Sequence, residues 1–349
     1  MSYSRPDDSW GYEPPESPRP ADGPGESPAW QTQEDPPRRS GRRRVAFARR
    51  GRGRPPKAAG ETDLQGEEAE RSEDHTMPPP TPHWLHRLPP LAVALVVGAG
   101  LILGAQLERP VYAAGIGVLQ LAMIVTVTWT RNISGAWVPL GVCAVLAAGV
   151  DWAAASWTPV SLLPVAVMVA GAYGAAAATQ LFRRDRSDVT DSLGFTMLLA
   201  VGTAGFACYI ALSRLGAAPP AMYSAVVAAT TAILAARAVD AVMPDPRINR
   251  QVTRGAFGVV IGTMCGTASA AYAGLVIEGP DARDAAVGGL MVALTAVLVD
   301  LACGYLAAAR RIDGDGAAPP PVIAAAGPLL AFALTGPVVY LLSAYYLVD

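Results

Sequence analysis

The stretch SLGFTMLLAVGTAGFACYIALS, residues 192–213, contains no charged side chain. A helix needs about 20 predominantly apolar residues to cross the hydrocarbon core of a bilayer. Stretches of the same character recur along the chain from residue 88 onward. The sequence therefore predicts an all-α, polytopic transmembrane bundle of about nine spans, at residues 88–107, 110–129, 136–156, 159–181, 192–213, 220–242, 256–277, 285–308 and 320–347.

The loops between these spans alternate in arginine content. One set of loops is poor, with only Arg109, Arg214 and Arg283. Short loops rich in Lys and Arg stay on the cytoplasmic side, so the N-terminus is predicted to be cytoplasmic and the C-terminus outside. The rich set consists of Arg131, Arg183, Arg184, Arg186, Arg247, Arg250, Arg254, Arg310 and Arg311.

The first 86 residues have a different composition from the rest, rich in Pro, Arg and Glu and poor in large apolar residues. Such a segment cannot bury enough apolar surface to offset its chain entropy. We therefore expect a disordered cytoplasmic tail at 1–86 and a nine-span transmembrane domain at 87–349. Lys57 is the only lysine, and Ala and Gly are abundant, as in GC-rich bacterial genomes. The predicted location is the inner (plasma) membrane, as a multi-pass protein.

The basic segment RRGRGRPPK at 49–57 contains a Gly-Arg-Pro tripeptide, which is similar to the core of minor-groove DNA-binding hooks. Electrostatic attraction to an anionic membrane surface accounts for the same residues. Anionic phospholipids are therefore the expected partners, with membrane proteins as further partners, and nucleic acid is not favoured.

Ionisable side chains inside a bilayer are costly and are functional hypotheses by default. Asp300 lies ten residues before Arg310, about 15 Å at the helical rise, and so near mid-membrane. Arg237 and Asp240 share a helix face, and Arg237 can pair with Asp240 or, if the sixth and eighth spans are neighbours, with Asp300. Such a pair either fixes helix packing or lies in a cytoplasm-facing polar pocket. Asp151, beside Trp152, is expected to be exposed at the outer interface.

These residues define the candidate site. Asp240 and Asp300 are the candidates for catalysis, and Arg237 with the loop residues Arg247, Arg250 and Arg254 are the candidates for ligand binding. No metal site is predicted, because the cysteines fall in separate spans without CxxC spacing and every histidine lies in or beside the tail. No cofactor is expected either.

Small residues and prolines inside the spans indicate how the helices pack. The spacing of Gly262 and Gly266 allows two helix backbones to approach closely, so a tight bundle is expected. Pro164, Pro328 and Pro337 interrupt otherwise helical spans. Each frees a backbone carbonyl that needs another partner, so each is expected to kink its helix or to line a polar cavity.

Residues 237–344 distantly resemble the phosphatidate cytidylyltransferase (CDP-diacylglycerol synthase) family of multi-span, Mg-dependent enzymes. The loop at 246–255 occupies the place of the family's Ser-Pro-x-Lys-Thr-x-Glu-Gly segment, with Thr253 and Gly255 matching but Val252 in place of the lysine. Val299-Asp300-Leu301 is similar to the family's Gly-Asp-Leu. The family's His-Gly-Gly-x-x-Asp-Arg-x-Asp signature has no counterpart, since residues 327–334 are apolar. The resemblance implies a relative that has lost its catalytic apparatus.

The sequence favours a non-enzymatic integral membrane protein that acts in membrane or envelope organisation through contacts with lipids or partners. Two alternatives stay open. One is a lipid-headgroup transferase like the CDP-diacylglycerol synthases, which would need Mg. The other is an ion- or proton-coupled transporter that uses Asp300.

Overall fold

The computed structural model describes residues 88–131, 137–182, 189–216, 218–243, 245–246, 255–277, 279–312 and 320–348. Within these ranges every regular element is an α-helix. The predicted tail at 1–86 lies outside the described residues, as do the loop arginines at 183–186 and 247–254.

Nine helices form in the described ranges, one for each predicted apolar span. Eight of them are long and apolar enough to cross a membrane, and α2, with 17 residues, is the shorter one. They are α2 (Leu88–Gly104), α3 (Arg109–Arg131), α4 (Trp137–Ser156), α5 (Leu163–Phe182), α6 (Val189–Ser213), α7 (Pro219–Val242), α8 (Ala256–Val276), α9 (Ala282–Ile312) and α10 (Pro320–Val348). The prediction of an all-α transmembrane bundle is confirmed.

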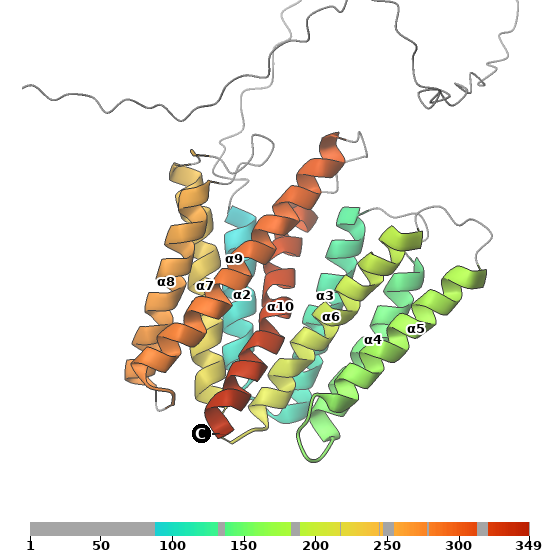
Figure 1. Ribbon diagram of the computed structural model, residues 1–349, viewed down its shortest axis with the longest axis horizontal. Coiled ribbons are helices and arrows are strands. Elements are labelled where there is room, and N and C mark those ends of the chain that lie inside the picture. The colour runs from blue at the N-terminus through green and yellow to red at the C-terminus, as the bar shows by residue number, and fades with distance from the viewer. Residues whose placement is uncertain are drawn as a thin grey trace, which may run out of the picture. The chain divides into compact units, whose positions relative to one another are not determined.

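The last helix joins two groups of helices. Helices α7, α8 and α9 pack together with α2 beside them, and α3, α4, α5 and α6 form the second group (Figure 1). Helix α10 contacts α2, α3, α6, α7 and α9, and so lies against both groups. Helices α6 and α10 are the most buried of the eight long spans, and α5 is the least buried.

The contact between α7 and α8 is built from small residues at intervals of four. A Cβ atom added to Gly262 would lie 2.7 Å from Ala236 Cβ and 2.8 Å from the Ala232 carbonyl oxygen. One added to Gly266 would lie 2.6 Å from Ala293 Cβ on α9. These distances leave no room for a side chain. The two glycines therefore allow α7, α8 and α9 to approach closely.

The prolines differ in their effects. Pro164 is the second residue of α5, where the backbone N–H has no intrahelical partner, so the expectation that it interrupts a span is wrong. Pro328 and Pro337 do lie inside α10. Pro337 cannot donate to the carbonyl of Ala333, four residues earlier, and that oxygen faces the backbone of Gly205 on α6, where an added Cβ would lie 1.9 Å away.

Candidate functional site

An ion pair between α7 and α9 forms the centre of the candidate site. Arg237 Nε donates to Asp300 Oδ2 at 2.9 Å, and Nη2 donates to Oδ1 at 2.5 Å. The Asp300 side chain is fully buried and that of Arg237 is 18% exposed. Of the two pairings that the sequence left open, the structure therefore shows the one between the sixth and eighth spans.

Gly327 on α10 lies against this ion pair, beside the two helices that supply its charges. A Cβ atom added to Gly327 would lie 2.3 Å from Asp300 Oδ1 and 3.1 Å from Arg237 Nη2. The pair thus lies against the α10 backbone, and three helices meet at it. Two parallel charge-assisted bonds in a low-dielectric setting fix both the distance and the rotation of these helices.

Asp240 has a different neighbour, although it is one turn from Arg237 on the same helix. Its Oδ1 accepts a hydrogen bond from the backbone N–H of Gly255 at 3.0 Å. Gly255 is the residue before the first turn of α8, where a carboxylate is favourable because unpaired N–H groups and the helix dipole point outward. Asp240 is 7% exposed and joins α7 to the start of α8.

The structure therefore brings Arg237 and Asp300 together and directs Asp240 to another helix end. Arg247, Arg250 and Arg254 lie outside the described residues. Within the described ranges, no three His, Cys, Asp or Glu side chains lie close enough to hold a metal ion. The four cysteines belong to four different helices, α4, α6, α8 and α9.

A second polar contact was missed by the sequence analysis. Asp151 was expected to be exposed at the interface, but it is half-buried and its Oδ1 accepts a hydrogen bond from Gln120 Nε2 on α3 at 2.7 Å. The same Nε2 donates to the Thr203 carbonyl on α6 at 3.1 Å. Gln120 is fully buried, and a glutamine in the middle of an apolar span was the signal that could have revealed the contact.

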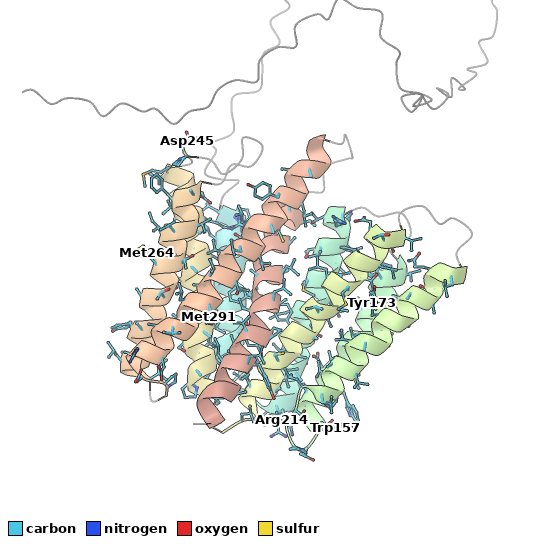
Figure 2. The ribbon with its side chains drawn as sticks, in the orientation of Figure 1. Trp157, Tyr173, Arg214, Asp245, Met264 and Met291 are labelled. Carbon is cyan, nitrogen blue, oxygen red and sulfur yellow. The ribbon has the colours of Figure 1, made fainter. Side chains whose placement is uncertain are left out.

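Two arginines that counted only toward topology also have structural partners. Arg131, at the end of α3, pairs with Asp191 at the start of α6 and stacks over the Phe195 ring, 5.7 Å from its centroid. Arg214, after α6, donates to the carbonyl oxygens of Ala154 and Trp157 at 2.8 and 2.9 Å, at the end of α4. Figure 2 shows Arg214 and Trp157 together at one end of the bundle.

Two apolar grooves run along the outside of the helices. One, of about 420 Å³, lies between α5, α6 and α10 and includes Tyr173 and Pro337 in its lining. The other, of about 540 Å³, lies between α8 and α9 and includes Met264 and Thr267. In Figure 2, Met264 is seen on α8 and Tyr173 on the opposite group of helices.

Comparison with protein-family models, with curated proteins and with solved structures gives no match.

Proposed function

We propose that this protein is a non-enzymatic component of a bacterial plasma membrane that organises the membrane through contacts with lipids and partner proteins. The observation that carries the proposal is the use of the buried charges. Both carboxylate oxygens of Asp300 accept hydrogen bonds from Arg237, and Asp240 accepts one from the backbone N–H of Gly255, the residue before α8. The charged groups of the candidate site that the structure describes, Arg237, Asp240 and Asp300, thus join helices to one another.

The geometry argues against the transferase alternative. Phosphoryl and nucleotidyl transfer depend on carboxylates that hold metal ions and on cations placed around the transferring phosphate. Asp240 and Asp300 are directed to different neighbours, the α8 N-terminus and Arg237. A metal ion would have to displace an arginine that is bound through two nitrogens.

The surfaces support lipid contact. The two apolar grooves open on the sides of the helices and are lined almost wholly by hydrocarbon, as suits acyl chains or the apolar face of another span. Arginines in the cytoplasmic loops would attract anionic headgroups, by about 1 kcal/mol for each residue near the surface.

A double-mutant cycle tests the proposal. The variants are Arg237→Met, Asp300→Leu and the two combined, with leucine chosen because its side chain branches as that of aspartate does. Each single variant leaves a buried charge without its partner and should lose about 3–5 kcal/mol of stability. The double variant removes both charges and should recover most of it. Thermal unfolding in detergent measures the stability, and complementation of a deletion strain measures the function.

The double variant shows whether the Arg237–Asp300 ion pair serves helix packing or takes a direct part in the protein's function. If it is as stable as the wild type and restores the strain, the charges serve packing. A stable double variant that fails to restore the strain contradicts the proposal. A second result would also contradict the proposal. It is the formation of CDP-diacylglycerol by the wild-type protein in phosphatidate vesicles supplied with CTP and Mg²⁺, if this activity depends on Asp300.

A further inference from the structure

The groove between α5, α6 and α10 and the arginine that follows α6 together have the features of a lipid site. The groove has a volume of about 420 Å³ and is lined almost wholly by hydrocarbon. Arg214 comes directly after α6. We propose that the groove holds one acyl chain of an anionic phospholipid of the outer leaflet and that Arg214 binds the phosphate of this lipid. The inference rests on the proposed function, since it names the lipid and the place of contact.

Small side chains on a helix with few neighbours keep the groove open. Helix α5 packs against α4 and α6 and is the least buried of the eight long spans. Ala166 and Ala170 of α5 and Ala204 of α6 belong to the lining, with Pro337 of α10. Ala166 and Ala170 are exposed. Their methyl groups leave a space along the helix that larger side chains would fill.

The length of the groove corresponds to one leaflet of a bilayer. On α5 the lining runs from Leu162, the residue before the helix, to Tyr173 near its middle. These residues are 11 positions apart, about 16 Å at the helical rise. The hydrocarbon core is about 30 Å thick, so the groove covers about half of it. An acyl chain covers one leaflet, whereas a helix of another protein needs a surface across the whole core.

The guanidinium of Arg214 has donors and charge left for an anion. Its Nη1 donates to the carbonyl oxygens of Ala154 and Trp157. Its Nε and Nη2 donate to no group in the part of the chain that the structure describes, and no Asp or Glu there forms an ion pair with it. Two carbonyls at a helix end carry only partial negative charge. Arginine binds phosphate through two parallel N–H groups, so a headgroup with net negative charge suits this residue.

The connection between α4 and α5 links the arginine to the groove. Trp157, whose carbonyl accepts from Arg214, begins the segment that leads to Leu162 at the end of the groove. Figure 2 shows Arg214 and Trp157 together at this end of the bundle. The arginine distribution assigns this end to the outside, and tryptophan side chains gather at the level of the headgroups. The phosphate and the acyl chain of an outer-leaflet lipid are thus expected at these two places.

The distance along α6 agrees with this arrangement. Cys208 is the last α6 residue of the groove lining. It lies six residues before Arg214, about 9 Å at the helical rise. The polar layer on each side of a bilayer is roughly 5–7 Å thick. A phosphate at Arg214 therefore lies beyond the hydrocarbon by a distance comparable with one headgroup layer.

Lipid titration followed by native mass spectrometry tests the headgroup contact. The full protein in detergent should bind one phosphatidylglycerol more tightly than phosphatidylcholine. Arg214→Gln, which keeps a donor for the two carbonyls, should weaken the binding of phosphatidylglycerol about tenfold, the effect of losing one hydrogen bond to a charged group. The control is Arg109→Gln, which removes an exposed arginine at the start of α3 and should leave the binding unchanged.

Photolabelling tests the acyl-chain contact. The probe is phosphatidylglycerol with a diazirine in the middle of one acyl chain, and illumination in vesicles should label peptides of α5 and α6. Ala170→Phe fills the groove from an exposed position and should reduce this labelling severalfold. The matched control is Ala268→Phe, also at an exposed position, which fills the groove between α8 and α9 and should leave the labelling of α5 unchanged.

Three results would overturn the inference. One is equal affinity of the wild-type protein for phosphatidylglycerol and phosphatidylcholine. Another is equal labelling of α5 in the wild-type protein and in Ala170→Phe. The third is a dimer in detergent that Ala170→Phe dissociates, which would show that a second copy of the chain covers the groove. None of them bears on the Arg237 and Asp300 cycle, because those residues lie on α7 and α9.

Discussion

At the scale of single residues, Gly327 explains how a charged pair fits inside the bundle. The space that a side chain would occupy on α10 is filled by the Asp300 carboxylate and the Arg237 guanidinium. A larger residue would push the carboxylate out of line with both nitrogens that bind it. The ion pair therefore depends on Gly327, a residue that has no side chain and takes no part in the hydrogen bonds.

Replacement of Gly327 by alanine should destabilise the protein by about 1–3 kcal/mol, the usual cost of overpacking a filled interior. The added Cβ would lie 2.3 Å from Asp300 Oδ1. The control is Gly171→Ala on α5, where nothing lies within 4 Å of the added atom. Thermal unfolding in detergent should show a lower midpoint for the first variant alone, and equal midpoints would mean that the α10 backbone does not confine the pair.

At the scale of elements, the contact between α6 and α10 shows how a proline can be accommodated deep in a bundle. The Ala333 carbonyl, which Pro337 cannot use, faces Gly205, and the Gly205 carbonyl in turn faces Gly336. One turn away, Tyr209 donates to the Phe332 carbonyl at 3.1 Å. Two backbones without intervening side chains, and the buried hydroxyls of Tyr209 and Thr335, which lie 2.9 Å apart, thus hold these helices together.

Gly205→Ala should separate α6 from α10 and cost more stability than Gly327→Ala. Its Cβ would lie 1.9 Å from a backbone oxygen, which cannot rotate away as a side chain can. Gly194→Ala on the same helix, with nothing within 4 Å, is the matched control. The yield of monodisperse protein and the unfolding midpoint measure the effect, and a Gly205→Ala protein as stable as its control would disprove the close contact.

At the scale of the whole transmembrane region, the helices define two opposite ends. Figure 2 shows Asp245 at one end and Trp157 and Arg214 at the other. The arginine rule assigns the Asp245 end to the cytoplasm. The orientation therefore follows from the composition of the loops.

Labelling of single cysteines should confirm this orientation. In a chain whose four native cysteines are replaced by alanine, Trp157→Cys should react with a membrane-impermeant thiol reagent in intact cells, and Asp245→Cys only in inverted vesicles. Trp157 is 47% exposed, which makes it accessible. Reaction of both cysteines from one side would contradict the number of spans between them, and a reversed pattern would contradict the orientation.

The sequence by itself determined the spans and their predicted orientation. Both follow from local properties, since an apolar stretch is read from about 20 neighbouring residues and loop charge from the few residues between stretches. The same local reading named Arg237, Asp240 and Asp300, because charge in an apolar stretch is conspicuous. It misjudged Pro164 and Asp151, since the exact start of a helix and the burial of a side chain depend on neighbours.

Only the tertiary structure decided which groups meet. Arg237 and Asp240 are close in sequence, yet Arg237 binds Asp300 because α7 and α9 are neighbours, and Asp240 binds the start of α8. Gln120 and Asp151 meet because α3 and α4 pack together. The side of a helix that carries a residue is a local property, but the helix that it faces depends on the packing of the whole bundle.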